Sequence, residues 1–219
     1  MINHQLRDHG TVSRVKRFRR NGGTSLWCLV LATATAVLIS ASTLAGTILG
    51  SKHDLSVKGG GDIKAASETE VCLFCHTPHR ALKDGPLWSH SMSLVTDYVP
   101  YDSSTIKAVV GQPTGASRLC LSCHDGTVAL GMVVSRSGNI EMQNSVTTMP
   151  DGRSNIGTDL SDDHPVSFKY DTQLVNDSGE LKPPASLLGR VRLDHGGEMQ
   201  CTSCHDPHDN QFGTFLVMS

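Results

Sequence analysis

Six of the seven cysteines occur in one short pattern, in which two cysteines are separated by two residues and followed directly by a histidine. The pattern stands at Cys72–His76 (CLFCH), Cys120–His124 (CLSCH) and Cys201–His205 (CTSCH). The seventh cysteine, Cys28, lies in an apolar segment near the N-terminus. Each of these three C-x-x-C-H frames places two thiols and one imidazole within five residues, a combination typical of sites that hold a metal cofactor.

The spacing within the frames predicts the covalent attachment of c-type haem. Two thiols at this separation add to the two vinyl groups of a porphyrin, and the adjacent histidine lies under the iron and supplies its proximal nitrogen. We therefore expect three haem c groups per chain. The predicted attachment residues are Cys72, Cys75, His76, Cys120, Cys123, His124, Cys201, Cys204 and His205.

Three other uses of the cysteine pairs stay open on the sequence alone. Disulfides suit an oxidising compartment, but a C-x-x-C bridge is strained and leaves the three histidines unexplained. A zinc site takes four ligands, thiolates with or without a histidine, and six thiols divide awkwardly among such sites. A thioredoxin-like redox pair needs a βαβ context, which the sequence lacks. Haem attachment explains both the cysteines and the histidines.

The second axial position of each iron needs a further ligand, and histidine is in surplus. The chain has 11 histidines, and six of those after residue 45 lie outside the frames. They are His53, His79, His90, His164, His195 and His208. We expect bis-histidine iron, with methionine as the alternative ligand. The available methionines are Met92, Met132, Met142, Met149 and Met199.

Position in the sequence limits which histidine can be the second ligand of each iron. His79 and His208 follow the histidine of their frame by three residues, which places them on nearly the same side of a helical turn. Each can therefore ligate only the iron of a neighbouring haem. His164 is the favoured distal ligand, because Pro165 restricts it to an extended backbone. Asp162 or Asp163 is expected to accept a hydrogen bond from its free ring N–H.

The N-terminal residues 1–45 are predicted to be an export signal rather than part of the fold. Five basic residues between Arg14 and Arg20 precede the apolar stretch Leu26–Ile39, and no charge occurs between Arg20 and Lys52. Small residues allow cleavage after Ala45. The alternative is an uncleaved anchor, because the uncharged stretch is long enough to span a bilayer. Both interpretations place residues 46–219 in the periplasm or outside the cell.

Composition limits the classes of function. The chain is 38% hydrophobic and 5% aromatic, a low apolar content for a globular domain. Residues 46–219 carry 13 basic and 20 acidic side chains, a net charge of −7. This acidic balance argues against nucleic-acid binding, which requires a basic surface. The low apolar content is explained if haems supply most of the core.

The elements that must position the frames are predicted to be short helices in a mostly irregular chain. Ser67–Glu70 has the form of a capping box that starts the first helix before Cys72. Ser117 is the expected N-cap of the second helix, and Gly126 is expected to close it. Residues 128–134 and 215–218 are expected to form short strands. The predicted fold is a small multihaem cytochrome c fold with few helices, little β-structure and haems in the core.

The chain resembles the multihaem c-type cytochromes with doubled C-x-x-C-H motifs. The stretches that carry the resemblance are CLFCHTPH, CLSCHDGTVAL, DDHPVSF and CTSCHDPH, at residues 72–79, 120–130, 162–168 and 201–208. It spans about residues 51–219. The resemblance implies an exported electron-transfer protein of anaerobic respiration, and it favours His53, His79, His164 and His208 as the pool of distal ligands. Some similar four-haem proteins form extracellular filaments, whereas this chain has three frames.

We expect an electron carrier rather than an enzyme. Two histidines on each iron leave no position for a substrate, and an acidic surface attracts basic redox partners. The expected partners are cytochromes or quinol-linked complexes. Membrane association through the N-terminal segment and assembly into a homo-oligomer or filament stay open. The alternative function is reduction of a small nitrogen oxide or oxyanion at one five-coordinate haem, but no frame departs from C-x-x-C-H.

Overall fold

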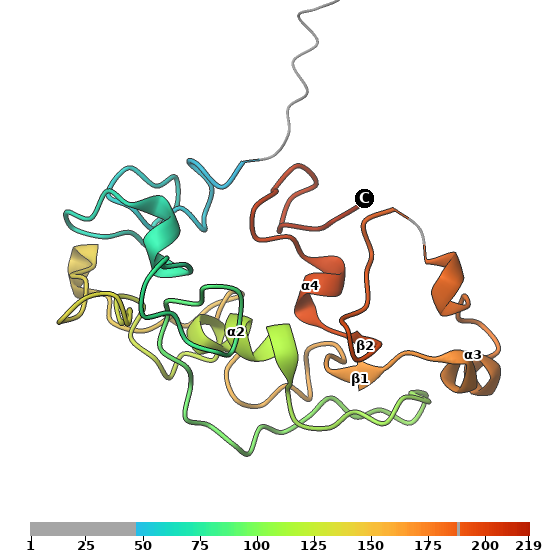
Figure 1. Ribbon diagram of the computed structural model, residues 1–219. Coiled ribbons are helices and arrows are strands. Elements are labelled where there is room, and N and C mark those ends of the chain that lie inside the picture. Colours follow the sequence, from blue (N-terminus) through green and yellow to red (C-terminus); the bar gives the residue numbers. More distant parts are fainter. Residues whose placement is uncertain (1–46, 188) are drawn as a thin grey trace, which may run out of the picture. The chain divides into compact units, whose positions relative to one another are not determined.

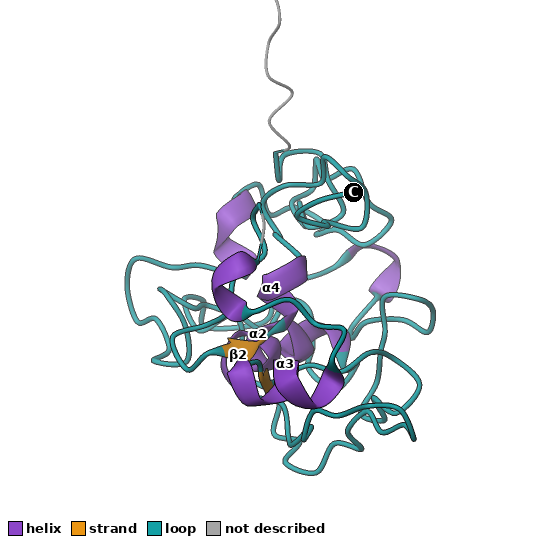
Figure 2. Cartoon of the chain, turned by 90° about the vertical axis from the view of Figure 1, so that its right-hand side faces the viewer, coloured by secondary structure: helices purple, strands orange, loops and turns teal. Residues whose placement is uncertain are grey.

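The computed structural model describes residues 47–187 and 189–219, all of which belong to one unit, residues 44–219. The predicted export signal at residues 1–45 lies outside the described residues. Short helices and one small sheet are connected by long loops and turns (Figures 1 and 2). Within the described ranges, no helix combines the length and the apolar character needed to cross a membrane.

The described elements follow one another along the chain as short segments. The helices are the 3₁₀ helix Val71–Phe74, α2 (Gly115–His124), the 3₁₀ helix Gln143–Ser145, α3 (Thr172–Ser178), the 3₁₀ helix Pro184–Ser186 and α4 (Cys201–Cys204). The strands are β1 (Phe168–Lys169) and β2 (Glu198–Met199). These strands pair antiparallel, with Phe168 opposite Met199. The first 3₁₀ helix, α2 and α4 each coincide with a C-x-x-C-H frame.

The first frame lies on a helix whose start was predicted for the wrong reason. The 3₁₀ helix begins at Val71, and no side chain caps its N-terminus. The carboxylate of Glu68 instead accepts hydrogen bonds from the backbone N–H groups of Thr69 and Glu70, at 2.8 and 2.9 Å. The predicted capping box at Ser67–Glu70 is therefore wrong, because Glu68 binds the amides that directly follow it.

Helix α2 carries the second frame and is the longest helix of the described chain. Its N-cap is Thr114, and the helix gives way to Gly126 at φ = 73°, a left-handed conformation that glycine adopts without strain. Ser117, expected to cap the helix, lies inside it. The Ser117 hydroxyl donates to Gln200 at 2.6 Å and accepts from the backbone N–H of Cys201 at 3.1 Å. The predicted cap is wrong because Ser117 has tertiary partners.

The two predicted strands are not formed. Residues 128–134 and 215–218 make only isolated bridges, His90 with Val133 and His205 with Leu216. In the first segment the N–H of Met132 donates to Ala129 at 2.8 Å and closes a turn. In the second segment Phe215 has a positive φ of 58°. Both features interrupt the extended backbone that a strand requires.

The protein's own apolar core is thin. Among the described residues, 13 hydrophobic and 12 polar or charged residues are buried, so apolar side chains do not fill the interior alone. One cluster contains Phe74, Leu130 and Met142, and Cys75 and Cys123 pack against it. A second cluster contains Tyr98, Leu121 and Leu160. The first cluster therefore joins the first and second C-x-x-C-H frames.

A buried glutamine joins the second and third frames. Gln200, 2% exposed, precedes Cys201 and forms a capping box with Ser203 at the start of α4. Its carbonyl oxygen accepts from the hydroxyls of Ser117 and Ser167, at 2.6 and 3.0 Å. Its amide nitrogen donates to Asp194 at 3.0 Å. Helices α2 and α4 are in contact as a result (Figure 1).

Candidate functional site

The histidine of each C-x-x-C-H frame is held by a backbone carbonyl. In all three, the Nδ1–H donates to a carbonyl oxygen on a later loop, which leaves Nε2 as the ring nitrogen with a free lone pair. The three hydrogen bonds are His76 to Pro86 at 2.9 Å, His124 to Ser154 at 2.6 Å and His205 to Thr214 at 2.8 Å. The rings are thus oriented in the tautomer that binds a metal through Nε2.

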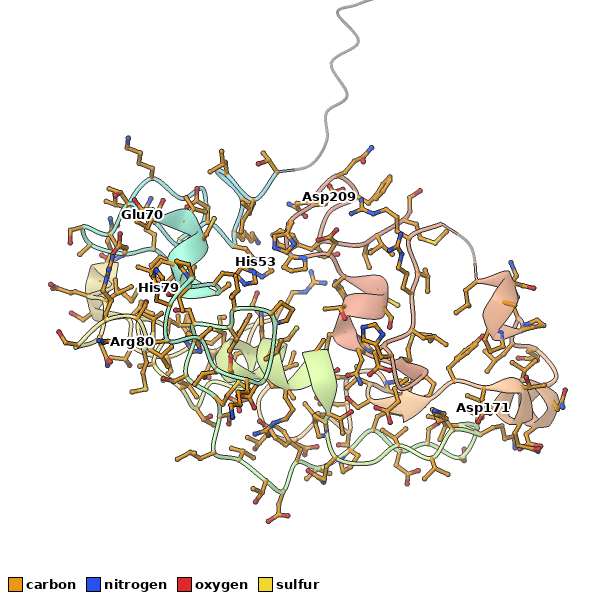
Figure 3. The ribbon with its side chains drawn as sticks, viewed as in Figure 1. His53, Glu70, His79, Arg80, Asp171 and Asp209 are labelled. Atoms are coloured by element: carbon orange, nitrogen blue, oxygen red, sulfur yellow. The ribbon has the colours of Figure 1, made fainter. Side chains whose placement is uncertain are left out.

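Each of these histidines faces a second histidine from a distant part of the chain. The ring pairs are His76 with His208, His124 with His53, and His205 with His164, with centroids 6.0, 6.0 and 6.4 Å apart. The rings of the first and third pairs are nearly parallel, at 14° and 13°, and those of the second are nearly perpendicular, at 80°. Figure 3 shows His53 among the side chains of several loops.

The spacing of these pairs fits one iron between each pair of rings. A metal–imidazole bond is about 2 Å long, and the ring centre lies about 1 Å behind the bonding nitrogen, so two opposite imidazoles on one metal have centroids about 6 Å apart. Rings stacked face to face are closer, as His53 and Phe215 are at 4.0 Å. The donor set therefore suits haem, with two thiols and two imidazoles at each of three places.

The ring of His53 lies close to three other histidines of the predicted set, His124, His208 and His205. Burial, together with proximity to His124, His208 and His205, lowers its pKa to about 4 despite a hydrogen bond to the Pro207 carbonyl, which acts in the opposite direction. The ring is accordingly uncharged at neutral pH. A neutral imidazole is the form that ligates a metal.

The thiols of the frames are free: Cys72 and Cys204 are exposed, and the other four are partly buried. No disulfide joins the six cysteines of the described ranges. Burial raises the pKa of the Cys75 thiol to about 11 and raises the pKa of Cys123 well above its ordinary value. A hydrogen bond to Cys201, together with burial, raises the pKa of Cys120. The thiols of Cys120 in the second frame and Cys201 in the third are therefore in contact.

The described residues contain neither a preformed zinc site nor a disulfide. In residues 47–187 and 189–219, no three His, Cys, Asp or Glu side chains converge as the ligands of a metal ion would. A zinc site needs four such ligands together. The C-x-x-C pairs are also unbridged.

A buried carboxylate stands beside the second frame. Asp125 follows His124, is 4% exposed, and accepts hydrogen bonds from the Tyr98 hydroxyl at 2.6 Å and from the N–H and hydroxyl of Thr127, both at 2.8 Å. Burial opposes its ionisation, but hydrogen bonds from Ser93, Tyr98 and Thr127 outweigh burial and hold its pKa below the usual value. A negative charge is thus buried next to His124.

Three of the six candidate second ligands, His79, His90 and His164, have different surroundings. His79 is exposed, and within the described chain its ring is paired with none of the frame histidines. His90 is 1% exposed and donates through Nδ1 to the Ser91 carbonyl at 2.9 Å. The predicted hydrogen bond from His164 to Asp162 or Asp163 is not formed in this part of the chain, although His164 itself faces His205.

Sequence reasoning missed the loops that orient the frame histidines. Residues 85–88 (GPLW) and 213–216 (GTFL) follow the first and third frames and make matching hydrogen bonds. The N–H of Thr77 donates to Leu87 and the N–H of Asp206 donates to Phe215, both at 2.8 Å. A comparison of the chain with itself beyond the C-x-x-C-H motifs would have found this repeat.

The chain matches no protein-family model, and no curated protein is significantly similar to it.

Proposed function

We propose that this chain is an exported c-type cytochrome that carries electrons through three covalently attached haems. The observation that carries the proposal is the set of three histidine pairs. Each pair consists of the histidine of one C-x-x-C-H frame and a histidine from a distant segment, with ring centroids 6.0–6.4 Å apart. Three pairs of similar spacing at three copies of one motif support a common role.

The residues that would hold each haem follow from the pairs. Haem 1 takes Cys72, Cys75, His76 and His208; haem 2 takes Cys120, Cys123, His124 and His53; haem 3 takes Cys201, Cys204, His205 and His164. When bound, each haem supplies an iron that gains and loses one electron. The chain supplies the axial imidazoles and the carbonyl hydrogen bonds that orient them. It also supplies the buried charge of Asp125.

The two histidines proposed for each iron support electron carriage rather than reduction of a substrate. Two imidazoles at each iron leave no coordination position for a nitrogen oxide or oxyanion, and such chemistry requires one. The thin apolar core also supports haems as interior packing, because the buried side chains alone are almost half polar. Cysteines of the first and second frames share one apolar cluster, and α2 contacts α4, so haems attached at these frames would be neighbours.

The surroundings of the protein are part of the proposal. The acidic balance of residues 46–219 suits a basic redox partner, either another cytochrome or a quinol-linked complex. The N-terminal segment supports export to the periplasm or beyond, as a cleaved signal or as an anchor. A role as a subunit of a cytochrome filament is compatible with electron carriage.

Haem content tests the proposal directly. We expect a pyridine haemochrome assay on the purified protein to give three haems per chain, because three complete frames are present. Replacing both cysteines of one frame, as in C72A/C75A, should lower the ratio by one. Replacing Cys28, which lies outside the frames, should leave it unchanged. A ratio of zero or one in the unaltered protein would overturn the proposal.

The spin state of the irons separates the carrier from the reductase. A carrier with two imidazoles on each iron is expected to give only low-spin ferric signals by electron paramagnetic resonance and to bind carbon monoxide poorly when reduced. A high-spin haem that binds carbon monoxide at full stoichiometry, together with turnover of nitrite or hydroxylamine, would favour the reductase instead.

A further inference from the structure

We propose that the loop after the third frame, residues 206–217, positions axial ligands of all three haems, and that Phe215 is the positioning residue for His53, the second ligand of haem 2. The inference rests on the proposed function, because it assigns the ring of Phe215 to the support of an iron ligand. It goes beyond that function in linking the three haem sites through one loop.

The loop touches a ligand of every haem. It carries His208, which faces His76 of the first frame at 6.0 Å. The carbonyl of Thr214 accepts from His205 of the third frame at 2.8 Å. The carbonyl of Pro207 accepts from Nδ1 of His53 at a longer 3.4 Å. One segment of 12 residues therefore contacts histidines that belong to three different pairs.

Phe215 gives His53 its closest ring contact. The two rings stack with centroids 4.0 Å apart and an angle of 24° between their planes. The ring of Phe215 is 8% exposed. Because the hydrogen bond from His53 to Pro207 is long, it restrains the imidazole weakly. The flat face of Phe215 is the feature that limits rotation of the His53 ring.

The backbone of the loop is strained at this point. Thr214 and Phe215 have φ values of 43° and 58°, in the left-handed region that non-glycine residues rarely adopt. Strain of this kind persists where surrounding contacts hold it and where it serves a site. The side chain of Asn210 accepts from the N–H of Phe215 at 2.9 Å, and the Phe215 carbonyl accepts from the N–H of Asp206 at 2.8 Å.

Ion pairs fix the base of the loop. The guanidinium of Arg190 binds the carboxylates of both Asp206 and Asp209. The Asp206 carboxylate also accepts from Nδ1 of His208 at 3.2 Å. The same aspartate therefore anchors the loop to Arg190 and orients the ligand that faces His76.

The loop after the first frame provides an internal comparison. Its residue Leu87 corresponds to Phe215, has nearly the same φ of 54°, and accepts the equivalent backbone hydrogen bond, from Thr77. The side chain of Leu87, however, is 55% exposed. The turn itself therefore needs no buried ring at this position. The stacking of Phe215 on His53 is an additional feature of the third loop.

The test compares Phe215→Ala with Leu87→Ala, which removes the side chain from the equivalent strained turn. Both proteins should contain three haems. In Phe215→Ala we expect part of the signal of one haem in three to become high-spin, with carbon monoxide binding at up to one site per chain. Leu87→Ala should remain low-spin. An unchanged low-spin spectrum in Phe215→Ala, with all three haems present, would overturn the inference and leave the proposed function intact.

A double variant identifies the affected haem. If Phe215 acts through His53, then His53→Ala/Phe215→Ala should show no more high-spin signal than His53→Ala alone, because the two changes remove one interaction. Additional high-spin signal in the double variant would place the effect on another iron and overturn the assignment. Should Phe215→Ala lose haem, Phe215→Leu retains apolar volume without the flat ring. It should still shift the signal of one haem, and an unaltered spectrum would overturn the inference.

Discussion

His79 and His208 show how surroundings decide the role of a residue. Each follows the histidine of its frame by three residues, within the similar stretches HTPH and HDPH. Both are exposed, but the ring of His208 lies 6.0 Å from that of His76, whereas His79 is outside the three pairs. The local spacing excludes a bond to the haem of the same frame for both. Only the path of the chain between frames brings His208 to another frame.

This contrast gives a prediction with a built-in control. We expect His208→Ala to open the iron of haem 1, 132 residues away in sequence, and to convert about a third of the low-spin signal to high-spin. Its carbon monoxide binding should rise to about one per chain, while covalent haem content stays at three. His79→Ala should match the unaltered protein in the same electron paramagnetic resonance and gas-binding measurements. An open haem in His79→Ala and not in His208→Ala would reverse the assignment.

At the level of elements, the sequence predicts where the three C-x-x-C-H frames lie, but it does not predict which distant histidine faces each frame. The spacing of Cys and His identifies the three frames, and the count of histidines identifies a pool that contains His53, His164 and His208. Which histidine faces which frame depends on long loops, so local spacing cannot determine it. The capping role of Ser117 failed for the same reason, because its partner is Gln200, 83 residues along the chain.

The contact between α2 and α4 depends on Gln200, and its loss should be costly. Gln200→Leu keeps an apolar side chain of similar size but leaves the buried hydroxyls of Ser117 and Ser167 without their acceptor. Each buried polar group without a partner costs about 1–3 kcal/mol, so we expect the free energy of unfolding to fall by about 2–5 kcal/mol. Denaturant titration of the haem-loaded protein measures this change.

The matched control for Gln200 is Gln211→Leu, which makes the same replacement at an exposed position. Substitutions at such sites usually change stability by less than about 0.5 kcal/mol. Equal stability of Gln200→Leu and the unaltered protein would show that the hydrogen bonds around Gln200 do not hold the second and third frames together.

At the scale of the whole molecule, the described protein combines an acidic net charge with a small apolar core. Residues 46–219 carry a net charge of −7, while the apolar side chains that would form an ordinary core are few. Under the proposed function, partner proteins would exchange electrons with haems through this acidic surface. Its acidic side chains then influence how fast a charged partner docks, because long-range attraction raises association rates.

The rate of electron exchange should therefore depend on salt. With a basic cytochrome as the partner, we expect the bimolecular rate constant to fall roughly tenfold between about 20 mM and 200 mM salt, because the screening length shortens over this range. Stopped-flow mixing of the reduced protein with the oxidised partner measures the rate. An uncharged small-molecule oxidant is the control and should show little dependence on salt. A rate that rises with salt for the basic partner would show that the docking surface is not acidic, despite the net charge of the chain.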